Sequence, residues 1–485
     1  MLKITIEEEV TSMENEKTVK PKKQIKKGGK ITLIILGSVV GILLLFFLFV
    51  FINSKVSSKV KVASTATNTT GLIQAINRGL YDKDGKEIIL EGCNIGGLFV
   101  TEGWINPYCI EDMSFDGSSY NYHELSQDNF LAGFKANPNL NDEQREELME
   151  IYYENWFTLD DAKKIKDIGM NCIRLPFYWR DILNEESDGT ITLKTKSESE
   201  GDVYENLDRV VNICKEAGLY VILDLHGCPG SQNGYEHGGS SDYNKTDADT
   251  IKFWYNEAYV DAVVSLWDEV SNHYKESETI ASYDIINEPR SKKFVTDKTC
   301  WDVMDKIYDA IRENGDNHVV TMEGCWSFSA LPNPKTYSWV NVQYSYHWYN
   351  WFKSKGLTYT LFYMYQDISN VGRNYNVPVS IGEFTFFDNE KDWNNGLSMF
   401  KSRHFSWTMW TYKMTVPGWW TNSWGIYNLK NRSGKAGYQD WKDVNVKTAT
   451  YDEIKPCFQD TNTNNTEFAV TSNTYNYLRK YFGTN

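Results

Sequence analysis

Two glutamates that lie far apart in the chain, Glu288 and Glu383, end short apolar runs of the kind that form buried strands. Glu288 ends SYDIINE (282–288), directly after Asn287, and Glu383 ends VPVSIGE (377–383). Two carboxyl groups can cleave a sugar acetal, because one protonates the leaving oxygen while the other attacks the anomeric carbon or activates a water on the opposite face. The pair is therefore a candidate for glycoside hydrolysis.

Other apolar runs also carry polar or aromatic residues at or toward their C-terminal ends. These are Arg174, His226, His347 with Tyr349, and Trp410. One such residue alone is ordinary, since strands often end in a polar residue at the solvent boundary, but six strand ends of this kind together indicate a site. Arg174 could favour the charged form of the nucleophilic carboxylate, and Asn287 could hydrogen-bond a sugar 2-hydroxyl. The acid must stay protonated, which requires drier or more negative surroundings.

The elements that must position these residues alternate regularly along the chain. Eight apolar runs are predicted as strands: 87–95, 171–177, 220–226, 282–288, 318–324, 340–347, 377–383 and 405–412. Amphipathic segments are predicted as helices: 159–169, 203–218, 251–275, 301–314, 358–375 and 473–482. This alternation, without a phosphate-binding glycine fingerprint, predicts a (β/α)8 TIM barrel, in which catalytic residues lie at the C-terminal ends of the strands.

These strand ends and their loops resemble glycoside hydrolase family 5, most closely its exo-β-1,3-glucanase branch, over roughly residues 72–485. The motifs are CNIGGLFVTEGW (93–104), NWFTLDDAKKIKDIGMNCIRLPFYWRD (155–181), LDLHGCPGSQNGYEHGG (223–239), INEP (286–289), HWY (347–349), GEF (382–384) and WTYK (410–413). Their combination is far more specific than any one of them.

The resemblance implies a retaining mechanism with Glu288 as the acid/base and Glu383 as the nucleophile. It implies a sugar subsite with polar contacts and a stacking floor: Arg174, His226, Asn287, His347, Tyr349 and Trp410. Glu102 would contact more distant hydroxyls. No cofactor or metal is expected, since the chain lacks the motifs and cysteine spacings that would bind one. Two positions depart from the branch, which usually has a tryptophan at Leu98 and an acidic residue at Thr415, so the linkage and the exo or endo preference stay open.

Aromatic residues and glycines gather after the predicted strand ends. The tryptophans are Trp348, Trp351, Trp419, Trp420 and Trp424. Aromatic rings can pack against the apolar face of a sugar, although any single tryptophan more often fills a core. The glycine-rich segment 227–239 is predicted to be an active-site loop, with a plain connector as the alternative.

Composition and missing motifs exclude several classes of function. The chain has no G-x-S-x-G elbow, Walker motif or metal-binding His/Glu spacing, which argues against a serine hydrolase, an NTPase and a zinc protease. Residues 1–61 carry a net charge of +6 and residues 62–485 a net charge of −21. An acidic protein is a poor match for nucleic acid, so a neutral β-glucan or β-glucoside is the expected partner. The 8 cysteines lack a CxxC pair, which favours buried thiols with one or two disulfides over a metal site. The oligomeric state stays open.

The N-terminal part contains a long apolar segment. Ile31 to Ile52 holds 22 residues without a charge, roughly 33 Å of helix, which favours an uncleaved transmembrane anchor that contacts the lipid bilayer over a signal peptide. Lysines between positions 20 and 30 outnumber those that follow the span, so the N-terminus is expected in the cytoplasm and the catalytic domain outside. The predicted parts are a cytoplasmic basic tail, a signal anchor, a linker and a hydrolase domain: 1–30, 31–52, 53–70 and 71–485. Secretion after cleavage is the alternative.

The resulting hypothesis is a retaining β-glucosidic hydrolase at the cell membrane. Other enzymatic possibilities are an endo-glucanase, a β-1,6-glucanase, a transglycosylase, or a glycosidase for glucosylated lipids or small molecules. The alternative outside catalysis is a surface pseudoenzyme that binds carbohydrate without cleaving it.

Overall fold

The computed structural model describes most of the chain. The described residues are 38–52, 62–110, 125–194, 202–239, 251–290, 295–324, 327, 330–349, 357–414, 424–429, 444–466 and 469–484. The chain divides into two compact units, Met1–Asn53 and Ser54–Asn485.

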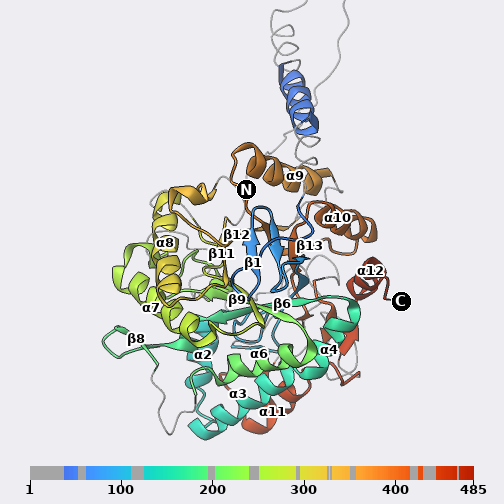
Figure 1. Ribbon diagram of the computed structural model, residues 1–485. Helices are drawn as coiled ribbons and strands as arrows, with labels where there is room; N and C mark the ends of the chain where they lie inside the picture. The colour runs from blue at the N-terminus through green and yellow to red at the C-terminus, as the bar shows by residue number, and fades with distance from the viewer. Residues whose placement is uncertain are drawn as a thin grey trace, which may run out of the picture. The chain divides into compact units, whose positions relative to one another are not determined.

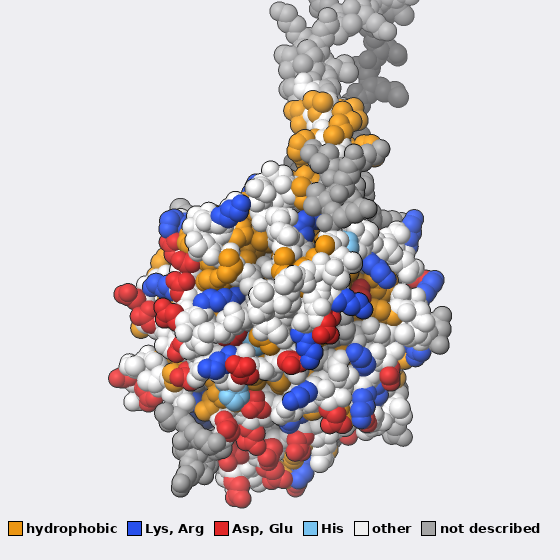
Figure 2. Space-filling view, viewed as in Figure 1, with side chains coloured by type: hydrophobic (Ala, Val, Ile, Leu, Met, Phe, Trp, Pro, Cys, Tyr) orange, Lys and Arg blue, Asp and Glu red, His pale blue; other side chains and the backbone are white. Residues whose placement is uncertain are grey.

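The first unit contains the predicted membrane anchor. Residues 38–52 are helical, whereas 31–37 of the predicted span lie outside the described residues. Within the described part of the chain, no helix combines the length and the apolar character needed to cross a bilayer. The surface of the helix is nonetheless hydrophobic (Figure 2). In the predicted linker, residues 53–61 are not described. Ala66 and Ser64, which belong to the second unit, hydrogen-bond with Gly85 and Glu87 of the same unit.

The second unit is built on a closed barrel of eight parallel strands, as predicted. In barrel order they are β4 (Glu91–Asn94), β6 (Cys172–Tyr178), β9 (Tyr220–Gly227), β10 (Ile280–Asp284), β11 (Val319–Glu323), β12 (Val342–Tyr349), β13 (Val379–Thr385) and β14 (Ser406–Met409). Each predicted strand is present. Four are shorter than predicted: β4 begins only at Glu91, β10 ends at Asp284, four residues before Glu288, β11 covers only Val319–Glu323, and β14 ends at Met409.

Helices lie around the barrel strands (Figure 1). The predicted ones correspond to α4 (Leu159–Ile168), α6 (Glu205–Ala217), α7 (Glu257–Tyr274), α8 (Asp297–Glu313), α9 (Leu357–Gly372) and α12 (Asn473–Phe482). Their ends follow local chemistry: Thr158 and Asp161 form a capping box at the start of α4, and Gly218 ends α6 in the left-handed conformation with a φ of 70°. Helix α7 begins later than predicted because a 3-10 turn, η2 (Phe253–Tyr255), precedes its cap Asn256.

Several elements were not predicted. The additional helices are α2 (Gln127–Lys135), α3 (Asp142–Trp156), α5 (Trp179–Ile182), α10 (Glu390–Ser402) and α11 (Tyr451–Gln459), with 3-10 turns η1 (Glu236–Gly238) and η4 (Pro334–Thr336). The additional strands form small sheets outside the barrel: β1 (Gln74–Ile76) and β2 (Gly79–Tyr81) with β3 (Glu87–Ile88), which is the start of the predicted strand 87–95; β5 (Tyr108–Cys109) with β17 (Val444–Asn445); β7 (Leu183–Glu185) with β8 (Ile191–Leu193); and β15 (Lys413–Met414) with β16 (Tyr427–Leu429) and β18 (Ala469–Thr471).

Close packing fixes the barrel around the site. A Cβ atom at Gly92 of β4 would lie 2.0 Å from the carbonyl oxygen of Cys172 in β6, so only glycine allows these strands to approach. Helix α3 supports the loop after β4, because the Tyr152 hydroxyl donates to the Gly97 carbonyl at 2.6 Å. Five buried cysteines are unbridged thiols: Cys93, Cys172, Cys214, Cys228 and Cys300.

Candidate active site

Arg174, near the middle of β6, is the centre of a buried polar network at the C-terminal end of the barrel. Its side chain is 1% exposed. Its contacts are Nε to Asp284 Oδ2 at 2.9 Å, Nη1 to Asn94 Oδ1 at 3.1 Å and Glu383 Oε1 at 3.0 Å, and Nη2 to Asn287 Oδ1 at 2.8 Å and Asp224 Oδ1 at 3.0 Å. Burial alone would lower the pKa of Arg174, but the surrounding carboxylates outweigh burial and raise it. The permanently charged Arg174 side chain therefore contacts residues of β4, β9, β10 and β13, and also the loop after β10.

Glu383 lies on β13 with both carboxylate oxygens held. Arg174 donates to Oε1 at 3.0 Å, and the Tyr349 hydroxyl donates to Oε2 at 2.6 Å. Burial and the neighbouring Glu383 carboxylate raise the pKa of Tyr349 well above its ordinary value, so this hydroxyl keeps its proton as a donor. Two donors fix the direction of the carboxylate, as a positioned nucleophile requires.

Glu288 lies beyond the end of β10 in an unusual backbone conformation. Its φ is 43°, in the left-handed region, which costs a non-glycine residue about 1–3 kcal/mol. Its backbone N–H donates to Glu323 Oε2 at 2.8 Å, and the preceding Asn287 N–H donates to the Leu225 carbonyl at 3.0 Å. These bonds offset the strain and hold the Glu288 carboxyl group in the barrel mouth.

Two histidines contact the two oxygens of Glu288. His347 Nδ1 lies 2.9 Å from Oε1, and His237 Nε2 lies 2.9 Å from Oε2. Burial, the largest single effect, would raise the pKa of Glu288, but the two histidines outweigh it and hold this pKa well below its ordinary value. The surroundings expected for a protonated acid are therefore not those of Glu288 in this structure.

The two glutamates face one another across the barrel mouth. One carboxylate oxygen of Glu288, one of Glu383 and a ring nitrogen of His347 all lie within 4.8 Å of one another. Carboxyl groups about 5–5.5 Å apart are typical of retaining glycosidases, whereas inverting enzymes separate them by about 6.5–9.5 Å to admit a water. The geometry therefore fits direct attack by one carboxylate.

The same three side chains are close enough to hold a metal ion, but charge argues against it. Burial lowers the pKa of His347, yet the carboxylates of Glu323 and Glu383 and the hydrogen bond that Nδ1 donates to Glu288 raise it well above normal. His347 Nε2 is 2.8 Å from Glu323 Oε1. A protonated imidazole has no lone pair for a metal, so the cation at this position is His347 itself.

His226 and Trp410 form one wall of the site. The two rings stack with centroids 5.4 Å apart and planes 13° apart, and His226 Nδ1 lies 2.6 Å from Asp224 Oδ2. Burial is the main cause that lowers the pKa of His226 to about 3, so this ring is neutral. Because Nδ1–H donates to Asp224, Nε2 is the acceptor and faces the Asn287 side-chain nitrogen at 3.5 Å.

Glu102, in the loop after β4, belongs to the same site. Its Oε2 accepts from Trp104 Nε1 at 2.8 Å. Burial, with the carboxylates of Glu236 and Glu383, raises the pKa of Glu102 to about 8 against the opposing effect of His237. At neutral pH this carboxyl group is mostly protonated, so it can donate a hydrogen bond.

An aromatic wall lies beside Glu102 and Glu383. The Trp424 ring centroid is 5.0 Å from Trp104, 5.3 Å from Tyr349 and 5.1 Å from Phe387. Of the other tryptophans expected on this face, Trp348 is half-buried on β12, while Trp351, Trp419 and Trp420 lie outside the described residues, as does Thr415.

All nine candidate residues from the sequence lie in this network, but sequence reasoning missed five of its members. These are Asn94, Asp224, Asp284, Glu323 and His237. A signal existed for Asp224 and Asp284, because an aspartate inside an apolar run is an uncommon strand residue that needs a buried partner. His237 lies in the glycine-rich loop 227–239 that was predicted to reach the site.

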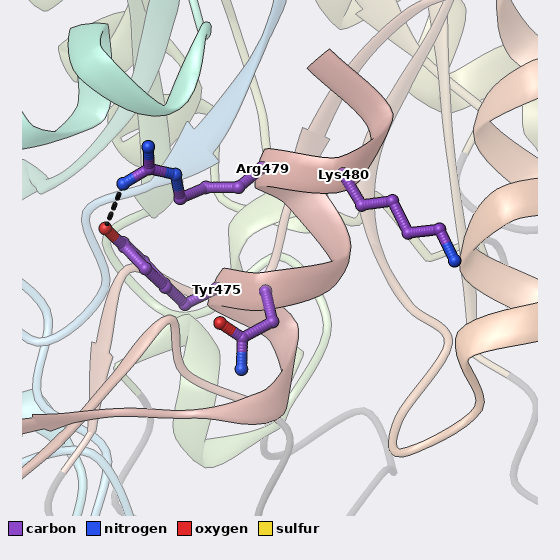
Figure 3. A pocket seen from close by; sticks show the side chains of 4 residues that line it. Tyr475, Arg479 and Lys480 are labelled. Atoms are coloured by element: carbon purple, nitrogen blue, oxygen red, sulfur yellow. Dashed lines mark hydrogen bonds between the residues drawn. The ribbon is translucent and has the colours of Figure 1, made fainter. Parts of the chain in front are cut away.

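A second hollow, of about 520 Å³, lies beside α12 and is lined by Tyr475, Asn476, Arg479 and Lys480 (Figure 3). Arg479 Nη1 donates to the Tyr475 hydroxyl at 2.9 Å. Its lining residues include no carboxyl group, so this hollow lacks the groups for acetal cleavage.

Comparison with known proteins assigns the family. The profile of cellulase (glycosyl hydrolase family 5) matches residues 137–415, which is more than half of the chain. The chain belongs to glycosyl hydrolase family 5, which confirms the family predicted from its motifs.

Several known proteins are similar to this chain. A β-xylosidase of Phanerodontia chrysosporium is 32% identical over 278 residues, which cover 56% of this chain and 51% of that protein. A glucan 1,3-beta-glucosidase of Pichia angusta is 29% identical over 238 residues, 47% of each. The chain thus spans about half the length of these curated relatives. A solved rutinosidase from Aspergillus niger is 16% identical, covers 76% of this chain and 98% of its own, and has a TM-score of 0.47.

Proposed function

We propose that this protein is a retaining glycoside hydrolase that cleaves the β-glucosidic bonds of β-glucan or related β-glucosides. The observation that carries the proposal is the pair Glu288 and Glu383, with one oxygen of each within 4.8 Å at the mouth of a closed barrel. This spacing suits a double displacement, in which a covalent glycosyl–enzyme forms and is then hydrolysed.

In the first half of the reaction, Glu383 attacks the anomeric carbon while Glu288 protonates the departing oxygen. In the second half, Glu288 takes a proton from water, the water oxygen bonds to the same carbon, and the bond from that carbon to Glu383 breaks, which frees the carboxylate. Arg174 and Tyr349 hold the Glu383 carboxylate during both halves, since each donates to a different oxygen. Asn287, whose side-chain oxygen is fixed by Arg174, is positioned to direct its nitrogen toward a sugar hydroxyl.

Neutral sugars suit the remaining walls of the site. Trp410 offers a ring face, and the Trp104–Trp424 pair offers a second apolar wall. The name of the Pichia angusta relative supports a β-1,3-glucan, and that of the Phanerodontia chrysosporium relative supports including a β-xyloside among the test substrates. Endo-glucanase, β-1,6-glucanase, transglycosylase and glucosylated-lipid glycosidase activities remain alternatives, as does a glycan-binding pseudoenzyme.

Product analysis on a substrate panel tests the activity. The full-length protein in detergent is assayed on laminarin, a β-1,6-glucan, soluble cellulose, glucosylceramide and aryl β-glucoside and β-xyloside, and the first-formed anomer is read by NMR. We expect release of sugar with the β configuration. Glu383→Gln should abolish turnover without a change in thermal unfolding, whereas Glu390→Gln, a surface carboxyl change on α10, should leave activity intact. An inverted product, or near-normal activity of Glu383→Gln, would refute the assignment.

We also propose that residues 31–52 anchor the protein in the cell membrane, with residues 1–30 cytoplasmic, 53–70 a linker and 71–485 an external catalytic domain. Exposed large hydrophobic side chains support this proposal: in the described part of the chain, all except Tyr255 and Val340 lie between Val39 and Ile52. Water disfavours such a surface, whereas lipid favours it. Alkaline extraction of membranes tests the anchor, and N-terminal sequencing of the mature protein distinguishes it from secretion after cleavage.

A further inference from the structure

His237 occupies a position that the two-carboxylate mechanism does not require. It lies in η1, and its Nε2 is 2.9 Å from Oε2 of Glu288. The two histidines on Glu288 differ in access: the His347 side chain is 0% exposed, whereas the His237 side chain is 27% exposed. Oε2 is therefore the oxygen that faces the open side of the site, and His237 is its partner.

The glycine-rich loop holds the His237 ring in place. Its imidazole stacks on Tyr235 with centroids 5.2 Å apart and planes 16° apart. A Cβ atom at Gly238 would lie 2.7 Å from Asn233 Oδ1, and Gly239, with a φ of 83°, packs against the Tyr178 ring. The position of His237 is thus built by tight packing on both sides of η1.

The base of the loop is tied to the catalytic strands. The buried Gln232 side chain donates to the carbonyl oxygens of His226 and Asn287 at 2.8 and 3.0 Å. Because Asn287 precedes Glu288, the segment that carries His237 and the segment that carries Glu288 are joined by hydrogen bonds. The 2.9 Å contact between these two residues is therefore a fixed feature of the site.

Charged groups from three segments face His237. They are Glu288 after β10, Glu236 within η1 and Glu102 after β4, while the nearby His226 on β9 is neutral. Burial would lower the pKa of His237, but these carboxylates, Glu288 foremost, raise it to about 10. Glu288 and His237 therefore share one proton at neutral pH, and that proton lies on the imidazole when the site is empty.

We propose that His237 stores the proton that Glu288 delivers to the leaving group. This inference rests on the proposed hydrolase function and deepens it. As the glycosidic oxygen approaches Oε2, the Nε2–H bond breaks and an O–H bond forms on Glu288. That proton then passes to the leaving oxygen while Glu383 bonds to the anomeric carbon, which leaves a neutral imidazole. In the second half, the water oxygen bonds to the anomeric carbon as the bond to Glu383 breaks, and the water proton moves to Oε2 and then to Nε2, which restores the pair.

The pH dependence of the reaction follows from this proton store. With His237 present, the shared proton is retained until the imidazole deprotonates. Without His237, the only proton for the leaving group is the one on Glu288, and His347 still favours the charged form of that carboxyl group. The alkaline limb of kcat/KM should therefore move to lower pH by about one unit or more in His237→Asn, a tenfold effect at a fixed alkaline pH. Asparagine can hydrogen-bond Glu288 but cannot store the proton.

Leaving-group dependence separates proton storage from simple positioning. Dinitrophenyl β-glucoside has a leaving group that departs without protonation, whereas phenyl β-glucoside and laminarin need the acid. In the full-length protein, His237→Asn should lower kcat/KM for the latter two by roughly 10- to 100-fold and change the dinitrophenyl rate by less than about threefold. His237→Lys, which restores an ionisable N–H, should recover part of the alkaline limb. His273→Asn on α7, whose ring stacks on Tyr204 and contacts Asp208, is the matched control.

Three results would overturn the proposal or its premise. Equal losses on all substrates with an unshifted alkaline limb would make His237 a structural residue only. If His237→Asn fails to fold, the test uses His237→Lys. A lysine variant that melts at the wild-type temperature but does not recover the alkaline limb of kcat/KM would also show that His237 is a structural residue only. A wild-type protein that cleaves none of the glycosides would instead refute the proposed function itself.

Discussion

Replacing Arg174 with lysine tests whether the buried network holds the site together. The guanidinium makes five contacts of 2.8–3.1 Å to oxygens of separate residues. An ammonium group has three donors on a different geometry, so at least two of these contacts must be lost. A hydrogen bond to a charged partner contributes about 1.5–3 kcal/mol, which gives an expected loss of about 3–6 kcal/mol.

This loss should appear in both stability and catalysis. Arg174→Lys is expected to lower the melting temperature, because buried Asp284 loses a hydrogen-bond donor and buried Asp224 loses its ion-pair contact. It should also lower kcat/KM on laminarin by more than about 100-fold, because a loss of about 3 kcal/mol in transition-state stabilisation by a misplaced nucleophile corresponds to such a factor. Arg373→Lys, at an exposed position just after α9, is the matched control and should stay within about 0.5 kcal/mol.

Differential scanning fluorimetry and initial-rate kinetics on the two variants give the comparison. Arg174→Lys could instead have the melting temperature of the control and retain activity within about threefold. In that case a single ammonium group can replace the planar guanidinium group, and the reasoning from contact geometry is wrong.

Two further predictions concern the carboxyl groups. Glu288→Ala should lower kcat/KM on laminarin by about 10²–10⁴. Azide should restore turnover of an activated aryl glucoside, and the product read by NMR should be the β-glucosyl azide. An α-glucosyl azide, or no rescue, would contradict the acid/base role. Glu102 should make stability fall as pH rises from about 4.5 to 8, because burial raises its pKa to about 8, so the folded state keeps a proton that the unfolded state has lost. The melting temperature of Glu102→Gln should fall less over this range; parallel curves for the two proteins would contradict the shift.

Hydrophobic patterning was sufficient to predict the barrel but not the ends of its strands. Ile285 and Ile286 are fully buried although β10 ends at Asp284. A buried loop and a buried strand have the same apolar composition, so the strand predicted from the sequence continues to Glu288. Helix α3 was missed because only Leu148, Tyr152 and Trp156 face the core, although Asn141 and Gln144 form a capping box that could have indicated its start.

The site was predictable where a residue ended a strand or matched a motif, and less so where its role depends on a partner far along the chain. Asp224 and Asp284 lie inside apolar runs, and Arg174, which neutralises them, is 50 and 110 residues away. His237 presented the same difficulty, because its contact with Glu288 exists only after the loop folds over the barrel mouth. Spatial pairing of this kind is not encoded in local spacing.

The balance of charge at the barrel mouth has a consequence for inhibitor choice. Carboxyl groups predominate over cations there: Glu102, Asp224, Asp284, Glu288, Glu323 and Glu383 surround Arg174, His237 and His347. A ring of sugar size that carries a protonated nitrogen would place its charge among these oxygens, whereas a sulfated or carboxylated sugar of the same shape would be repelled. Iminosugars, not anionic analogues, are therefore the scaffold from which tight ligands for this pocket should be built.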